Sequence, residues 1–303
     1  MKNQNPYTIK TISEYHKRCG IDKPAHPLVS VIDFSQIKKS SESLPSSISY
    51  GFYSVNLKKN YQGKVKYGQQ YYDFDEGMMS FYAPNQVINV ENDSADIPEG
   101  WTLIIHPDFL HGTSLAIKFK DYGFFSYCVH EALHLSEKEE VIMDGLLLNL
   151  QKEIEQNIDG YSQDVIISHI ELLLNYCNRF YNRQFITRKK VSNDLLLNFE
   201  QLLSDYFNED NKFAELPTVQ YFSERLAVSP NYLTDMLKNL TGLTAQQHIH
   251  LFIIEKAKEL LSTTSNSVSE IAYRLGFEFP QSFNKLFKNK TNLTPLQFRA
   301  SVN

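Results

Sequence analysis

The sequence has few cysteines and no long apolar run. Its three cysteines (Cys19, Cys128 and Cys177) are odd in number and scattered through 303 residues, so they fit neither a disulfide framework nor a four-cysteine zinc cluster. No apolar run approaches the roughly 18 residues that span a membrane. The first residues, MKNQNPYTIKTISEYHKRCG, lack the apolar core of a signal peptide. We therefore expect a cytoplasmic protein with reduced thiols and no membrane contact.

An excess of positive charge is also missing. Lysine and arginine number 30 against 35 acidic residues, which gives a formal net charge of −5. This balance argues against non-specific attraction of the whole chain to nucleic acid, but it is compatible with a local basic face. Apolar residues make up 42% of the chain, enough for globular cores, and the length indicates about two domains.

The N-terminal part contains many short runs rich in Tyr, Phe, Val and Ile. Between residues 26 and 129 these include LVSVIDF, SYGFYSVNL and WTLIIH, separated by Gly, Pro, Asn and Asp. Such runs are typical of many short β-strands and predict a barrel or a sandwich. We place this β-rich domain at residues 1–135.

The pattern changes to helical at Ser136. Ser136 and Glu139 form an S-x-x-E capping box, and apolar residues follow at helical spacing. A second amphipathic helix follows Gly160, so residues 136–181 are predicted to form a helical hairpin. Two interpretations remain open: the hairpin packs on the β-rich domain, or its remaining apolar stripe forms a dimer interface. The polar and basic residues 182–194 are expected to be a linker before a helical domain at 195–303.

The segment HEALH (residues 130–134) matches H-E-x-x-H, the pattern of helical zinc sites in metallopeptidases. On a helix this spacing brings both imidazoles to one metal. Ser136, however, is predicted to start a helix two residues later, which leaves the segment as an extended junction with the histidines about 13 Å apart. A zinc peptidase using His130, Glu131 and His134 is kept as an alternative function. Otherwise we expect neither catalysis nor a cofactor.

The C-terminal third contains an internal repeat. The segment SPNYLTDMLKNLTGLTAQQHI starts at Ser229 and aligns with FPQSFNKLFKNKTNLTPLQFR, which starts at Phe279. The identical pairs are Pro230 and Pro280, Lys238 and Lys288, Asn239 and Asn289, Thr241 and Thr291, Leu243 and Leu293, Thr244 and Thr294, and Gln247 and Gln297. Two copies are too few for a solenoid, so they indicate one small helical unit used twice.

Each copy is predicted to be a helix, a tight turn and a second helix. In the first copy Ser229 caps the second helix, Pro230 takes its first position and Gly242 ends it. In the second copy Gly276 permits the turn. A helix of about 18 residues, capped by Thr244, joins the copies and spans about 27 Å. That length is close to one turn of DNA, about 34 Å.

The second helix of each copy has a polar outer side. A helix-turn-helix places this helix in the major groove, where Asn and Gln pair with adenine and Lys with guanine or phosphate. The exposed polar positions are predicted to be Asn231, Thr234, Asp235, Lys238, Gln281, Ser282, Asn284, Lys285 and Lys288. Each residue taken singly is equally well explained as an ordinary solvated helix face. From Lys285 onward there are three lysines, one arginine and no acidic residue, a strip suited to phosphates.

These residues resemble the AraC family of bacterial transcription regulators. The resemblance is clearest in EKAKELL (255–261), SEIAYRLGF (269–277) and FNKLFKNKTNLTPLQFR (283–299), and it covers about the last hundred residues. It implies an all-α double helix-turn-helix domain with two recognition helices in successive major grooves of promoter DNA. The base contacts it implies fall on Asn231, Thr234, Asp235, Gln281, Ser282 and Lys285. The phosphate contacts expected beside them fall on Ser229, Lys238, Asn284, Lys288 and Lys290.

Two departures from the family pattern lie in or near the first copy. Asp235 stands where members often carry a hydrogen-bond donor such as Arg, although a carboxylate can accept from cytosine. Members also commonly have a basic residue just before EKA, where Leu251 and Ile253 lie here. The second copy therefore matches the family better than the first.

The N-terminal segments YDFDEGMMSFYAPNQVINV and GWTLIIHPDFL resemble the cupin-type sensory barrel of many members. The helices after it would then be the dimerisation segment. The fold class expected is α+β with two domains, a cupin-like β-barrel followed by the helical DNA-binding domain. The function expected is a dimeric, sequence-specific transcription regulator that is nucleoid-associated when bound to DNA. A small effector with unidentified pocket residues and RNA polymerase are further partners compatible with the resemblance. An architectural DNA binder without ligand control is a further alternative.

Overall fold

The computed structural model describes residues 7–38, 47–59, 65–67, 70–72, 77–89, 99–127, 131–187, 189–208 and 215–302. The chain forms two compact units, Met1–Gln184 and Phe185–Asn303. Among the helices in the described ranges, none combines the length and the apolar content needed to cross a membrane.

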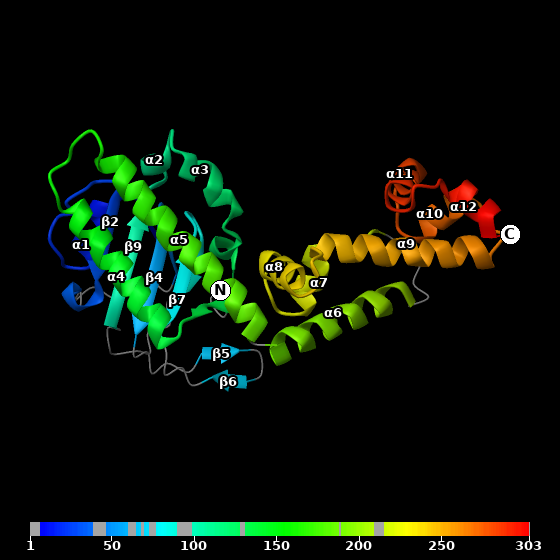
Figure 1. The fold of residues 1–303 in the computed structure, drawn as a ribbon, viewed down its shortest axis with the longest axis horizontal. Coiled ribbons are helices and arrows are strands. Elements are labelled where there is room, and N and C mark those ends of the chain that lie inside the picture. Colours follow the sequence, from blue (N-terminus) through cyan, green and yellow to red (C-terminus); the bar gives the residue numbers. More distant parts are fainter. Residues whose placement is uncertain are drawn as a thin grey trace. The chain divides into compact units, whose positions relative to one another are not determined.

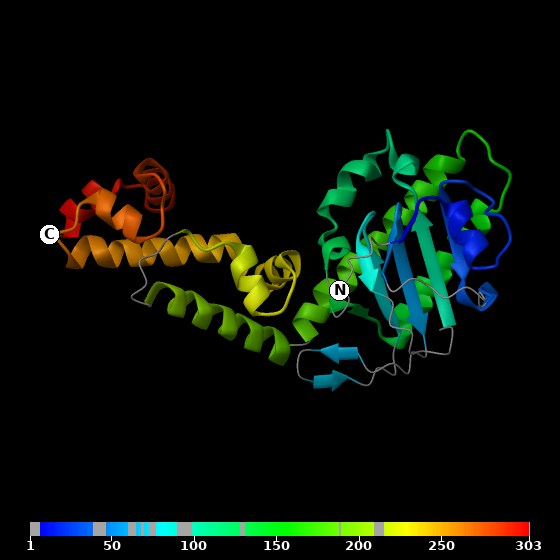
Figure 2. The same cartoon turned by 180° about the vertical axis from the view of Figure 1, so that it is seen from behind.

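A five-stranded antiparallel sheet forms the centre of the N-terminal unit (Figures 1 and 2). Its strands in spatial order are β10 (Leu133–His134), β7 (Met78–Tyr82), β4 (Tyr53–Lys59), β9 (Glu99–Ile105) and β2 (Val29–Asp33). Four consecutive residues are buried in each of β2, β4, β7 and β9. The sheet is therefore covered on both faces, and polar residues such as Ser30, Asn56 and Thr102 are buried within its strands.

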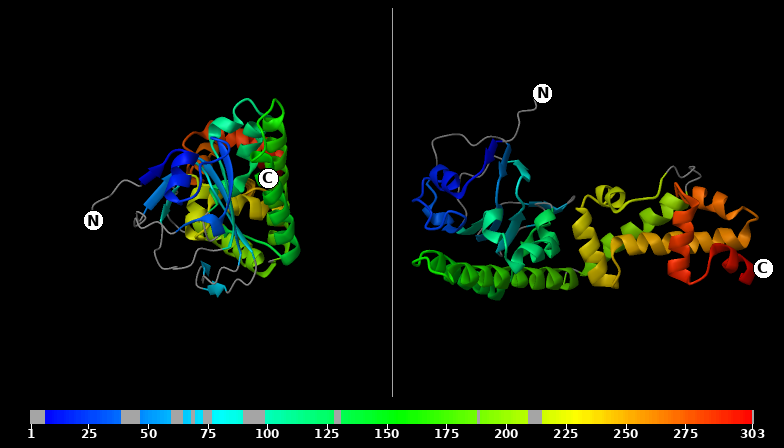
Figure 3. Two further views of the ribbon diagram at one scale, coloured as in Figure 1. Left: turned by 90° about the vertical axis from the view of Figure 1, so that its left-hand side faces the viewer. Right: turned by 90° about the horizontal axis from the view of Figure 1, so that it is seen from above.

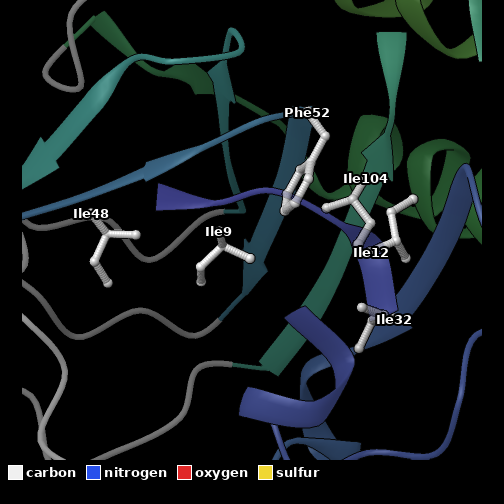
Figure 4. Close-up of a cluster of buried hydrophobic side chains, with 6 residues drawn as sticks. All are labelled: Ile9, Ile12, Ile32, Ile48, Phe52 and Ile104. Carbon is white, nitrogen blue, oxygen red and sulfur yellow. The ribbon is translucent and has the colours of Figure 1, made fainter. Parts of the chain in front are cut away.

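A smaller sheet and a short helix cover one face. The strands are β1 (Tyr7–Ile9), β3 (Ser47–Tyr50) and β8 (Val87–Asn89), and the helix is α1 (Ile12–Arg18). A cluster of six apolar side chains, each at most 2% exposed, joins these elements to β2 and β9 (Figure 4). Its members are Ile9, Ile12, Ile32, Ile48, Phe52 and Ile104.

The remaining short elements of this unit lie outside both sheets. A two-stranded hairpin is made of β5 (Val65–Tyr67) and β6 (Gln70–Tyr72). The short helices are η1 (Phe34–Gln36), α2 (Pro107–Leu110), α3 (Ser114–Lys118), η2 (Phe119–Asp121) and η3 (Gly123–Ser126).

The expected closed barrel is not found among the described strands. The five-stranded sheet has open edges at β10 and β2, and the smaller sheet has its own edges at β1 and β8. A barrel needs every strand to pair with two neighbours. Short strands separated by turn residues predicted the β-rich class correctly, but strand partners depend on long-range packing that this pattern does not specify.

Helices α4 (Glu137–Ile154) and α5 (Ser162–Thr187) cover the other face of the five-stranded sheet (Figure 3). Helix α4 starts at the predicted capping box, where Glu139 Oε2 accepts the Ser136 N–H at 2.9 Å. Trp101 Nε1, on β9, donates to Asp144 Oδ1 on α4 at 3.0 Å. The inner sides of these helices pack on the sheet, as the first of the two interpretations predicted. On their outer sides some apolar residues are exposed: Val141, Ile142, Leu148, Val165 and Leu172.

The described part of the HEALH segment is extended, as its place before Ser136 predicted; His130 lies outside the described residues. Leu133–His134 forms strand β10 and pairs with β7. The His134 N–H donates to Gln184 Oε1 at 2.8 Å, and Arg183 Nη2 donates to the His134 carbonyl at 2.6 Å. The described residues 131–134 therefore do not form the helical face that a zinc site needs. The segment instead joins the end of α5 to the sheet.

The boundary between the units falls inside residues 182–194, for which we predicted a linker. The described residues of this segment are helical: α5 ends at Thr187, and α6 (Lys189–Asn208) starts directly after residue 188. Phe185 is buried, and the Ser192 hydroxyl donates to its carbonyl at 3.2 Å. Phe185 and Ser192 are buried although the segment is polar overall, and the hydrogen bond between them connects the end of α5 to the start of α6.

The C-terminal unit is entirely helical in its described residues. After α6 come α7 (Val219–Arg225), α8 (Pro230–Thr241), α9 (Ala245–Thr263), α10 (Val268–Arg274), α11 (Pro280–Thr291) and α12 (Pro295–Val302). Helix α6 packs on the first half of the unit, where the Phe199 ring lies 5.4 Å from that of Phe222 on α7. Phe207, also on α6, lies 5.4 Å from Phe252 on α9.

Candidate nucleic-acid interface

Two helix-turn-helix units lie at the two ends of α9 (Figure 1). The first unit is α7–α8 and the second is α10–α11. Helix α9 has 19 residues and is therefore about 28 Å long at 1.5 Å per residue. Because both units pack on this one helix, their recognition helices α8 and α11 are held at a separation that α9 determines.

The ends of α8 and α11 follow from the repeated sequence. Both helices have 12 residues and begin with proline, whose missing N–H needs no partner at that position. Each ends at a residue in the left-handed conformation, Gly242 at φ 78° and Asn292 at φ 60°. Glycine and asparagine are the residues that adopt this conformation at least cost, so the two helices stop at equivalent points.

The hydrogen bonds after each recognition helix are duplicated as well. The Thr241 hydroxyl donates to the Leu237 carbonyl and accepts the Leu243 N–H. Thr291 makes the same two bonds in the second unit. The predicted caps Thr244–Gln247 and Thr294–Gln297 are also both formed. The internal repeat predicted from sequence is therefore a structural repeat, down to individual hydrogen bonds.

The turns inside the two units differ. In the first unit Ala227 adopts φ 55°, and two residues later the Ser229 hydroxyl caps α8. In the second unit Gly276 adopts φ 87°, and the turn is one residue longer before Phe279 takes the N-cap position. A side chain on Gly276 would place its Cβ 2.6 Å from the Glu215 carbonyl oxygen, so only glycine fits there.

The buried sides of α8 and α11 determine which sides face out. Leu233, Met236 and Leu237 on α8 are fully buried, as are Phe283 and Phe287 on α11. Residues three and four apart share a helical face. The side opposite these apolar residues therefore points to solvent on both helices.

Most of the predicted DNA-contacting residues lie on these solvent-facing sides. The exposed ones are Asn231, Lys238, Gln281, Ser282, Asn284, Lys285, Lys288 and Lys290. Thr234 and Asp235 are half-buried. The residues predicted to contact bases are thus all exposed on α11, whereas on α8 only Asn231 of the predicted three is fully exposed.

Ser229 does not belong to this accessible set. It is 5% exposed, and its hydroxyl accepts the Tyr232 N–H at 3.2 Å. Its role is to start α8, as its cap position predicted, and a phosphate contact from its side chain is not compatible with its burial.

One basic residue of the C-terminal strip, Arg299, is directed toward α9. Burial lowers the pKa of His250 on α9, and the positive charge of Lys290 lowers it further. Arg299 donates from Nε to the Leu261 carbonyl at 3.1 Å and from Nη2 to the Asn266 carbonyl at 2.7 Å. Arg299 therefore caps the end of α9. The sequence signal for this role is a break in the repeat, because Arg299 aligns with the apolar Ile249.

One side of α8 is buried at a position where the equivalent side of α11 is exposed to solvent. Tyr232 is 6% exposed and its ring lies 5.3 Å from that of Phe185. Ser282, the aligned residue on α11, is exposed. The charges differ as well, since α8 carries Asp235 and Lys238 whereas α11 carries three lysines and no acidic residue. The second unit therefore presents a wider and more positive surface. The two units together form a double helix-turn-helix domain.

Comparison with known proteins agrees with this class. Residues 222–301 match the family described as a helix-turn-helix domain. The transcriptional activator RhaS of Salmonella heidelberg is 32% identical over 146 residues, which are 48% of this chain and 50% of RhaS. Histidine kinase P4 of Formosa agariphila is 34% identical over 123 residues, 40% of this chain and 9% of the kinase. A Chromobacterium violaceum regulator with an AraC-type DNA-binding domain is 22% identical, covers 37% of this chain and 96% of that one, and has a TM-score of 0.33.

The C-terminal domain of this chain is therefore similar to the helix-turn-helix domain of known transcription regulators. The chain spans about half the length of RhaS and a small fraction of the kinase.

Proposed function

We propose that the protein is a sequence-specific DNA-binding transcription regulator in which α8 and α11 enter two successive major grooves of one duplex. The observation that supports this most is the duplication itself: two equivalent helices, each with one buried apolar side and one polar side, packed on one rod. The rod is about 28 Å long and one DNA turn about 34 Å, so the two spacings are comparable.

In this proposal Asn231, Thr234 and Asp235 contact bases from the first unit, and Gln281, Ser282 and Lys285 from the second. Lys238, Asn284, Lys288 and Lys290 contact phosphates.

Selection from a pool of random 40-base-pair duplexes (about four DNA turns) with the full chain tests this function. We expect one sequence family to be enriched, and its affinity to fall linearly with the logarithm of salt concentration because each neutralised phosphate releases counterions. Affinity that is the same for all sequences at every salt concentration would instead favour architectural binding. The absence of any enriched or bound duplex would overturn the proposal.

The N-terminal unit is proposed to contain a cupin-like sensory domain at residues 1–135. It has a surface cavity of about 660 Å³, within the usual range of small-molecule sites. Phe34, Ile37, Trp101 and Leu148 give the cavity apolar walls. Trp101 is the only tryptophan of the chain, so binding of an effector there would change the intrinsic tryptophan fluorescence. A metabolite screen with this readout, repeated on Leu148→Glu, identifies the effector if it binds here.

The hairpin at residues 136–181 is proposed to form a homodimer through its outer side, followed by the connection at 182–194 and the DNA-binding domain at 195–303. Val141, Val165 and Leu172 leave 37–70% of their surface exposed on that side. Such a stripe on two adjacent helices favours burial against a second copy. We expect Leu172→Glu to convert a dimer into a monomer in sedimentation experiments. The matched control, Asn178→Glu on the same helix, changes an exposed polar position on a different side of the helix from Val165 and Leu172 and should leave the dimer intact.

A further inference from the structure

The second unit carries an exposed aromatic residue where the first unit has a capping serine. Ser229 is buried and its hydroxyl caps α8. Phe279, at the N-cap of α11, makes no side-chain capping bond and is 56% exposed. A phenylalanine here is unfavourable twice over, because the helix loses a cap and a large apolar surface faces water.

Neighbouring phenylalanines show that this exposure is specific to Phe279. Phe277, two residues earlier, is 5% exposed, and its ring lies 5.4 Å from that of the fully buried Phe283. The core around the turn is therefore already filled by other rings. Phe279 stands at the start of the recognition helix, two residues before the exposed Gln281 and three before the exposed Ser282. The first residues of a recognition helix are those that reach base edges.

We propose that Phe279 contacts the C5 methyl group of a thymine in the major groove, and so determines specificity at one position of the site. This inference rests on the proposed function. The thymine methyl is the apolar group that base pairs present in the major groove, and apolar side chains including Phe recognise it. The contact removes both the ring and the methyl from water, which gives the exposed ring a partner once DNA is bound.

Replacing thymine by deoxyuridine tests the contact without altering any hydrogen-bonding group. The duplex enriched by the full chain is synthesised with each thymine changed singly to deoxyuridine. We expect one position at which the change weakens binding by about fourfold, the value of one buried methyl group. For Phe279→Ser the affinity should be the same with thymine and deoxyuridine at that position. Serine is chosen because it caps α8 in the first unit and is expected to keep α11 folded.

Tyr273→Ser is the matched control. Tyr273 is 55% exposed on α10, the helix of the unit that does not enter the groove, so this variant should keep the fourfold difference. A wild-type chain insensitive to deoxyuridine at every position would overturn the inference and leave DNA binding standing. So would a Phe279→Ser variant that keeps the wild-type difference. Failure to enrich any duplex would instead overturn the proposed function from which the inference starts.

Discussion

The two helix-turn-helix units share their backbone but differ in what they expose. In the first, Ser229 is buried as a cap, Tyr232 packs on Phe185 and the charges of Asp235 and Lys238 offset each other. In the second, Phe279 and Ser282 are exposed and three lysines are unopposed on α11. Phe185, near the end of α5, accounts for part of the difference, because its ring covers Tyr232 on the first unit. The two copies therefore share the residues that start, end and bury the helices, whereas the residues that point outward differ between copies.

Exchange of the left-handed residue should destabilise the turn of the second unit far more than the turn of the first. Gly276→Ala would force a Cβ to 2.6 Å from the Glu215 carbonyl oxygen at φ 87°. We expect a loss of about 3 kcal/mol in the free energy of unfolding of the C-terminal unit, measured by urea with helical circular dichroism. Ala227→Gly removes strain at φ 55° and should change stability by less than about 1 kcal/mol. Equal effects from both exchanges would contradict the close approach at Gly276.

Lysines on α8 and α11 should contribute differently to DNA affinity. Lys285→Ala is expected to weaken binding to the selected duplex by about 1–3 kcal/mol and to relax specificity at one base pair. Lys238→Ala should weaken all sequences alike and reduce the salt slope by about one. Fluorescence anisotropy over a salt series distinguishes these results. If Lys285→Ala left both affinity and preference unchanged, Lys285 would not be a base-reading residue.

Substitutions at the N-cap positions of α8 and α11 should have opposite effects on stability. Ser229→Ala leaves the Tyr232 N–H without its acceptor and is expected to cost about 1 kcal/mol of stability. Phe279→Ser supplies the missing acceptor to α11 and should raise stability by up to about 1 kcal/mol. The two variants compared by thermal unfolding should therefore shift the midpoint in opposite directions. A lower midpoint for Phe279→Ser would show that the ring stabilises the free protein, against the account given for it.

The smallest expected effect is electrostatic. Burial first, and then the charge of Lys290, hold the pKa of His250 below its ordinary value of 6.5. Because the unfolded chain then binds more protons, His250 lowers stability as pH falls below about 6.5. In a histidine NMR titration Lys290→Ala should raise this pKa, whereas Lys288→Ala should leave it in place. An unchanged pKa in Lys290→Ala would place Lys290 away from α9.

Much of the C-terminal fold could be predicted from sequence because its signals are local. Pro230, Gly242 and the Thr244–Gln247 capping box mark helix ends directly. The constant offset of fifty residues between the copies predicted that the same helix ends occur twice. Burial of Tyr232 and Arg299 depended on partners far along the chain, Phe185 and the end of α9, which no local pattern names.

The N-terminal sheets show the same limit more strongly. Apolar runs located the strands, but the pairing of β4 with both β7 and β9, and the open edge at β2, follow from packing under α4 and α5. The DNA-facing residues could be placed on the correct helices from sequence. Which of them are accessible required the structure, and Ser229 is the case in which the expectation was wrong.

Hydroxyl-radical footprinting of the full chain on its selected duplex tests the central claim most directly. If α8 and α11 both enter the major groove, each copy of the domain should protect two windows on one face of the duplex, about 10–10.5 base pairs apart. A variant with Lys285→Ala and Gln281→Ala should lose the window of the second unit and keep that of the first. A single window for each copy of the domain in the wild-type chain would contradict the claim that both α8 and α11 read DNA.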